Sequence, residues 1–119
     1  MKAKATPAAP PDRVEAYDRL VAAVPEVERK GASMPYMSVN GNMFSYLDAA
    51  GSMALRLSPE DRAAFIARHS TRLHVAHGVV QKEYVTVPGD LLDDPEQLLP
   101  SFRAGLAYAQ ALKAKPTRR

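Results

Sequence analysis

The dipeptide Asn40-Gly41 restricts the fold more than any other feature of the sequence. It stands between two short segments rich in β-favouring side chains, 36–39 and 42–47. A type I′ turn needs positive φ at both central residues, and Asn and Gly adopt that conformation at the lowest steric cost. We therefore expect strands at 36–39 and 42–47 that pair as antiparallel neighbours.

Three further segments show a β-type pattern. A turn at 49–52 precedes 53–57, where alternating apolar side chains predict a third strand with one buried face. Residues 73–76 and 83–87 predict two more strands, on either side of a loop that contains His77–Gly78. Consecutive strands joined by such short turns are antiparallel neighbours, so we expect an antiparallel sheet of about five strands.

Helix-start signals flank the strands. Asp12 and Glu15 have capping-box spacing, and the apolar period that follows predicts a helix over 13–24. Ser58 precedes a proline and two acids, which is the composition of a helix N-terminus. It predicts a second helix over 59–68.

The same start signal recurs at Asp94-Pro95, and an apolar stripe continues from there to Leu112. Pro100 lies within this stripe, so we expect it to kink the last helix or to divide it into one turn and a longer helix. The resulting order is α-β-β-β-α-β-β-α, with no internal repeat and no βαβ alternation. It predicts an α+β fold in two layers, an antiparallel sheet with helices packed on it.

Length and composition fit one folded domain. The chain has 119 residues, of which 46% are hydrophobic and 24% charged, values typical of a globular protein. It has no cysteine, which excludes disulfides and thiolate chemistry and points to the cytoplasm. No segment has the apolar run of a signal peptide or of a membrane span, so we expect neither export nor membrane insertion.

Positive charge is concentrated at the two ends of the chain. The net charge is +3, yet 1–11 and 113–119 hold six of the 16 basic residues and none of the 13 acidic ones. The part between them, 12–112, is therefore net negative and has no overall attraction for phosphate. We expect 1–11 to be a disordered tail, 12–112 the folded domain and 113–119 a basic tail. Weak nucleic-acid contact through the tails is the alternative to simple solvation.

No group of residues has the spacing of a catalytic or metal site. His69, His74 and His77 fall close together, but no third ligand or supporting carboxylate follows at a fixed spacing. The chain has no glycine-flanked serine nucleophile and no glycine-rich phosphate loop. The acidic pairs at 60–61 and 93–94 stand where helix N-termini favour negative charge. We therefore expect no catalytic residues, no metal and no cofactor.

One group of side chains is a candidate binding surface. Aromatic and methionine residues are concentrated in the first three predicted strands, namely Tyr36, Met37, Met43, Phe44, Tyr46 and Met53. Because side chains alternate along a strand, some of these line the core and the others face outward. Outward members and nearby charged or aromatic residues form the predicted binding set, which is Lys30, Tyr36, Arg56, Lys82 and Tyr84.

Several of these motifs resemble the N-terminal domain of the TfoX/Sxy proteins. That family has a hairpin of the form V-[DN]-G-x-M-F, and V-N-G-N-M-F stands here at 39–44. It also has a strand ending in Y-x-x-V-P before an acidic helix start, matched by E-Y-V-T-V-P at 83–88 and D-D-P-E at 93–96. The resemblance covers nearly all of 12–112. The M-F-G-G run of the family is replaced at 31–35 by G-A-S-M-P.

The resemblance implies a stand-alone TfoX N-terminal-like domain, related to the YjbR-like group, without established catalytic residues. With no catalytic set in the sequence, we expect a regulatory or adaptor role through a protein partner. Two alternatives stay open. One is a nucleic-acid-binding module for transcription or competence, in which Lys30, Arg56 and Lys82 contact phosphate groups. The other is a small-molecule binder or an enzyme with an unrecognised site. A homodimer would cover the edges of an open sheet.

Overall fold

The computed structural model of the chain describes residues 9–31 and 34–112. Its elements follow the order α-β-β-β-α-β-β-α-α, which confirms the predicted α+β fold and adds one short helix. The helices are α1 (Pro11–Val21), α2 (Pro59–His69), α3 (Gly89–Leu92) and α4 (Pro95–Ala111). The strands are β1 (Tyr36–Val39), β2 (Asn42–Leu47), β3 (Met53–Arg56), β4 (Leu73–Ala76) and β5 (Val79–Val87).

The strands form one antiparallel sheet in the order β1-β2-β3-β5-β4. Asn40 and Gly41 have φ of 55° and 77°, so the predicted tight turn between β1 and β2 is confirmed. His77 and Gly78 form a second turn of the same kind, with φ of 54° and 74°. The prediction that the last strand begins at residue 83 is wrong, because this two-residue turn lets β5 begin at Val79.

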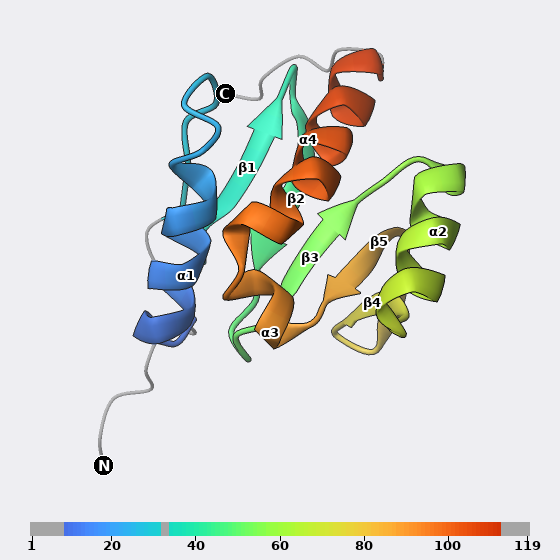
Figure 1. The fold of residues 1–119 in the computed structure, drawn as a ribbon, viewed down its shortest axis with the longest axis horizontal. Helices are drawn as coiled ribbons and strands as arrows, with labels where there is room; N and C mark the ends of the chain where they lie inside the picture. The colour runs from blue at the N-terminus through green and yellow to red at the C-terminus, as the bar shows by residue number, and fades with distance from the viewer. Residues whose placement is uncertain (1–8, 32–33, 113–119) are drawn as a thin grey trace.

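The helices pack on one face of the sheet: in Figure 1, α3 and α4 lie in front of the strands, α1 stands at the left beside β1, and α2 stands at the right. Two ion pairs join the N-terminal part of the chain to its last third. Arg13 Nη2 lies 2.7 Å from Asp93 Oδ1, and Arg103 Nη1 lies 2.6 Å from Glu26 Oε2. None of the helices within the described ranges is long and apolar enough to cross a bilayer.

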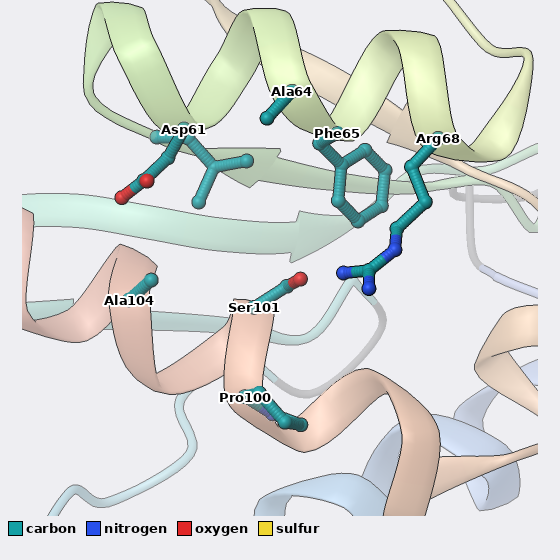
Figure 2. Close-up of a pocket in the computed structure, with 8 residues that line it drawn as sticks. Asp61, Ala64, Phe65, Arg68, Pro100, Ser101 and Ala104 are labelled. Carbon is teal, nitrogen blue, oxygen red and sulfur yellow. The ribbon is translucent and has the colours of Figure 1, made fainter.

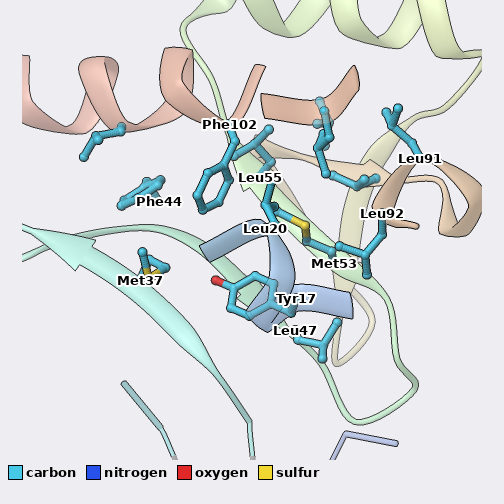
Figure 3. Close-up of a cluster of buried hydrophobic side chains, with 14 of the residues drawn as sticks. Tyr17, Leu20, Met37, Phe44, Leu47, Met53, Leu55, Leu91, Leu92 and Phe102 are labelled. Carbon is cyan, nitrogen blue, oxygen red and sulfur yellow. The ribbon is translucent and has the colours of Figure 1, made fainter. Parts of the chain in front are cut away.

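The core lies between this helix layer and the sheet (Figure 3). Its largest fully buried members include Tyr17, Leu20, Met37, Phe44, Leu47, Met53, Leu55 and Phe102. Phe44 of β2 meets Phe102 of α4 with ring centres 5.5 Å apart. This contact joins the last helix to the middle of the sheet.

A bulge in β2 turns two consecutive side chains toward the helices. Met37 pairs with Ser45, but the next residue of β1 pairs with Met43, which leaves Phe44 as the extra residue. Phe44 and Ser45 are both fully buried, and the Ser45 hydroxyl is hydrogen-bonded to the Tyr17 hydroxyl of α1 at 2.5 Å. The bulge therefore couples α1 to the sheet through a buried polar contact.

The predicted capping box at Asp12 is wrong. α1 begins at Pro11, with Pro10 in the N-cap position and no side-chain cap, because proline supplies the first helical φ without needing a hydrogen-bond acceptor. Asp12 pairs instead with its neighbour Arg13 at 3.3 Å. Ala9 is buried, so the packed part of the chain starts before the predicted boundary at Asp12. Residues 1–8 of the predicted tail 1–11, and all of the predicted tail 113–119, lie outside the described residues.

The other two helix starts are confirmed. Ser58 accepts a hydrogen bond from the Asp61 backbone N–H at 3.3 Å, and Asp94 accepts one from Gln97 at 3.3 Å. Pro100 lies inside α4, and the helix continues through it rather than dividing there. The short separate helix lies before α4 in the chain and is α3.

Gly105 marks a close approach of α4 to β3. A Cβ at this position would lie 2.8 Å from the backbone oxygen of Arg56 and 2.8 Å from Leu55 Cδ1. We expect Gly105→Ala to lower the free energy of unfolding by about 1–3 kcal/mol, although alanine is the better helix former, because the strand backbone blocks the added methyl group. Urea unfolding followed by circular dichroism measures this change.

Gly89→Ala is the matched control, since no atom lies within 4 Å of a Cβ at position 89. We expect its unfolding free energy to be unchanged or slightly raised. A Gly105→Ala protein as stable as the wild type would show that α4 does not lie this close to the sheet.

Candidate functional site

The sheet face opposite the helices carries a row of aromatic side chains. Tyr36 of β1 pairs directly with Tyr46 of β2, so the two rings share this face. The Tyr84 ring of β5 lies 5.6 Å from Tyr46 although β3 runs between their strands. Ala54 is the β3 residue paired with Tyr46, and its small side chain leaves space for this contact. We call this side the open face.

The β4–β5 hairpin folds over part of the open face. In the strand order, β4 stands three strand spacings from β2, about 14 Å in a flat sheet. Nevertheless the His74 ring of β4 lies 5.6 Å from the Tyr46 ring, and His74 Nε2 lies 3.3 Å from Asp48 Oδ2. Tyr46 also donates a long hydrogen bond of 3.4 Å to Gln81 of β5. These contacts require the hairpin to curl back over β2 and β3.

An irregularity in β5 allows this curl. Leu73 pairs with Val85, but the next residue, His74, pairs with Gln81. Residues 82–84 are therefore extra on β5, and a strand with unmatched residues bends away from the plane of the sheet.

The His74 ring is the anchor of the folded hairpin. Its side chain is only 3% exposed, and its Nδ1 is hydrogen-bonded to the Thr86 hydroxyl at 2.8 Å. Nε2 lies within ion-pair distance of Asp48 but has no hydrogen-bond partner. Burial lowers the pKa of His74, and the nearby Asp48 carboxylate opposes this shift only in part. The ring is therefore favoured in its neutral form.

The hairpin and the first two strands form the walls of a half-open cavity of about 440 Å³. Its lining is mostly apolar and consists of Met34, Tyr36, Met43, Tyr46, Leu47, Asp48, Ala49, Ala76, His77 and Gln81. A volume of this size lies within the range of known ligand pockets. We call it the sheet-face cavity, and it is the candidate functional site.

One member of the predicted binding set, Tyr36, lines this cavity. Lys30 forms an isolated bridge with Tyr36, with reciprocal backbone hydrogen bonds of 2.9 and 2.8 Å, and its side chain is exposed. Side chains paired in this way lie on the same side of the backbone, so Lys30 stands beside Tyr36 at the outer edge of β1.

Arg56 and Tyr84 lie on the open face but are engaged in structural contacts. Arg56 forms an ion pair of 2.6 Å with Glu83, and its guanidinium lies 5.9 Å from the centre of the Tyr84 ring. Both side chains donate hydrogen bonds to the backbone carbonyl of Met43, at 3.2 and 2.8 Å. Met43 adjoins the β2 bulge, so these bonds support the backbone where its regular pairing is interrupted. Lys82 is exposed in the bent segment of β5.

Sequence reasoning missed Asp48, His77 and Gln81 as site residues. Asp48 follows β2 immediately and reads as part of a turn. His77 and Gln81 enter the cavity only because the hairpin folds back. The dipeptide His77-Gly78 carries a usable signal, since histidine is one of the residues enriched at positive φ and glycine adopts it freely.

Two phenols of the open face have raised pKa values. Burial raises the pKa of Tyr46, and it raises the pKa of Tyr84 to about 12, so neither phenol acts as a base near neutral pH. Among the residues that the structure describes, no three His, Asp or Glu side chains lie together in a way that could hold a metal ion.

A second cavity lies in the helix layer, between α2 and α4 (Figure 2). Figure 2 shows Phe65 and Arg68 of α2 pointing toward Ser101 of α4. We call this second cavity the helix-layer cavity. Its volume is about 390 Å³, and its lining includes side chains of both charges, Asp61 and Arg68. It contains none of the predicted binding residues. The sheet-face cavity is the stronger candidate because its lining is more apolar and includes Tyr36.

The burial of His74 predicts an acid-sensitive stability. A folded-state pKa below the ordinary value of 6.5 stabilises the fold above about pH 6.5, and this contribution is lost as the pH falls and the unfolded chain takes up the proton. We expect the unfolding free energy to decrease between about pH 7.5 and about pH 5.5, and to decrease less in His74→Gln. Urea unfolding at both pH values measures the difference. His69→Gln is the control, and an equal effect of both substitutions would contradict this role of His74.

Tyr84 predicts a second effect at high pH. Because its folded-state pKa is raised from 10.0 to about 12, its contribution to stability is complete below pH 10 and is lost as the pH rises toward 12. We expect the alkaline loss of stability to be shallower in Tyr84→Phe. Unfolding curves across this range, with phenolate absorbance as a second signal, test it. An unchanged profile in Tyr84→Phe would show that the phenol is solvated.

Comparison with known proteins agrees with the motifs. The sequence profile described as the TfoX N-terminal domain matches residues 18–109, which is more than three quarters of the 119-residue chain. The matched range includes all five strands of the sheet and most of α4. No curated protein and no solved structure matches the chain. The chain belongs to the TfoX N-terminal domain family.

Proposed function

We propose that this domain is a non-catalytic binding module with a regulatory or adaptor role, and that it acts in the cytoplasm by holding a protein partner on its open face. The sheet-face cavity is the observation that carries the proposal. It presents a concave, mostly apolar surface on a small domain, and such surfaces favour protein or ligand contacts.

Exposed apolar side chains lie next to the cavity and on the outer side of the hairpin. Met34 at the rim is 42% exposed, and Val79, paired with the lining residue Ala76, is 60% exposed. Val75 and Val80 are 49% and 48% exposed, and they form an aliphatic pair on the side of the hairpin opposite His74 and Gln81, because side chains alternate along a strand. Burying these side chains against a partner is favourable because it removes apolar surface from water.

The kinds of side chain in the lining also support a protein partner. Met34 and Met43 are flexible and adapt to irregular partner surfaces. Tyr36 and Tyr46 add large, amphipathic rings of the kind enriched among the residues that dominate binding energy. A partner side chain inserted between them would be shielded from water by the hairpin on one side and by β1 and β2 on the other.

A variant in the cavity wall tests this proposal. We expect Met43→Lys to weaken partner binding at least about tenfold, because it places a charge in the apolar lining. Ala64→Lys is the matched control, since it introduces the same charge into the helix-layer cavity. The measurement is quantitative mass spectrometry of proteins retained by each immobilised full chain, followed by calorimetry with the partner identified.

The proposal requires a partner that the wild type and Ala64→Lys retain and Met43→Lys loses, with all three proteins folded by circular dichroism. Equal retention by all three proteins would contradict it. Loss with Ala64→Lys alone would transfer the site to the helix layer. Sedimentation of the same proteins shows whether the partner is a second copy of the chain.

The aromatic row favours one second candidate, a single-stranded nucleic acid. Tyr36, Tyr46 and Tyr84 follow one another across an open sheet, and bases stack on aromatic side chains in many such domains. Lys30 stands at the edge of this row, where it would meet a phosphate. Fluorescence anisotropy with labelled single-stranded DNA and RNA, at two salt concentrations, tests it. Binding that Tyr36→Ala leaves unchanged would exclude the open face as its site.

A further inference from the structure

The charge in the sheet-face cavity indicates what kind of group would occupy it, provided that the proposed binding function holds. Asp48 is the only carboxylate among the described residues that line the cavity, and no lysine or arginine lines it. The side chain of Asp48 is 27% exposed. An apolar cavity with one acidic group in its wall favours an occupant with an apolar body and a positive end.

One oxygen of Asp48 is committed to the local turn. Oδ1 accepts hydrogen bonds from the backbone N–H of Ala50 at 3.0 Å and of Ser52 at 2.9 Å. Oδ2 takes no part in the turn. A carboxylate can accept further hydrogen bonds at this second oxygen, so the turn leaves it able to receive a ligand.

The neighbour of Oδ2 does not neutralise the carboxylate. His74 is the one side chain able to carry positive charge that lies within ion-pair distance of Asp48 in the described part of the chain. Its burial lowers the pKa and favours the neutral ring. His74 is itself only 3% exposed and lies behind Asp48, with Nε2 3.3 Å from Oδ2. The cavity wall thus keeps the negative charge of Asp48.

The basic residues around the cavity lie at its margins. Lys30 stands on the far side of Tyr36 from β2, at the outer edge of β1. Arg72 precedes β4 and acts on His74 only through its charge. A positive group that enters the cavity would therefore avoid the rim at Lys30 and be drawn toward Asp48.

We propose that the sheet-face cavity receives a lysine or arginine side chain of the partner protein, with its charged end at Asp48 Oδ2. The aliphatic stem of such a side chain packs well against the methionines and Leu47. Tyrosine rings attract cations through their faces, and Tyr36 and Tyr46 line the path to Asp48. The attraction to Asp48 is stronger in this partly enclosed site than in open water.

Three small probes of similar size but different charge test this assignment: phenethylammonium, 2-phenylethanol and phenylacetate. The full chain is labelled with ¹³C at the methionine methyl groups and titrated with each probe by NMR. Met34 and Met43 line the cavity and report binding, whereas Met37 and Met53 are fully buried in the core and serve as internal references. We expect phenethylammonium to half-saturate the Met34 and Met43 shifts at a concentration about tenfold lower than 2-phenylethanol, and phenylacetate to bind most weakly.

Asp48→Asn removes the charge and keeps an oxygen acceptor for the Ala50 and Ser52 N–H groups. We expect it to abolish the preference for phenethylammonium and to leave the binding of 2-phenylethanol unchanged. Asp61→Asn, in the helix-layer cavity, is the control and should keep the preference. The comparison of probes on the wild type tests the assignment even if Asp48→Asn does not fold.

Each outcome separates this inference from the proposed function. Equal binding of phenethylammonium and 2-phenylethanol, or tighter binding of phenylacetate, would overturn the cationic occupant and leave the cavity as a binding site. A preference that persists in Asp48→Asn would also overturn it. If no probe shifts Met34 or Met43, the cavity is not a ligand site, and both the inference and the proposed function fail.

Discussion

The position of the His74 ring determines the shape of the open face. The ring lies beside Tyr46 and is hydrogen-bonded to Thr86, and these two residues flank Ala54 in the sheet. Because the Ala54 side chain is small, the imidazole fits against β3 on the open face. The β4–β5 hairpin that carries His74 therefore bends toward this face. Without this contact the hairpin would continue the plane of the sheet, and β1 and β2 would have no second wall opposite them. The existence of the cavity, and which residues line it, therefore depend on the burial of the His74 ring.

Most of the fold could be predicted from local sequence signals. The turn at Asn40-Gly41 located β1 and β2 because a type I′ turn depends only on the positive φ of its two central residues. Alternation along these strands correctly separates Tyr36, which lines the cavity, from Met37 in the core. The start of α1 was missed because Asp12 has the spacing of a cap, whereas two consecutive prolines set the helix start two residues earlier, at Pro11.

The candidate site was less predictable because it depends on two departures from regular strand pairing. One departure is the bulge at Phe44, which depends on how the sheet packs against the helices. The other is the set of extra residues 82–84, which depends on the buried position of His74. No short sequence motif encodes these two irregularities. Arg56 and Tyr84 therefore seemed available for binding in the sequence. In the fold they hydrogen-bond the Met43 carbonyl beside the bulge. Asp48, the charged group of the cavity wall, could not be recognised until the hairpin was in place.

The pairing of the N-terminal helix with the last one has a consequence for how the chain folds during its synthesis. α1 is made first, yet it packs against α4, and its ion pair from Arg13 to Asp93 spans 80 positions. The β1–β2–β3 meander, by contrast, contains only short-range contacts and can form while translation continues. The part of α1 that packs on α4 therefore stays exposed until nearly the whole domain has left the ribosome. A chain interrupted before residue 95 would present that unsatisfied surface to chaperones and proteases.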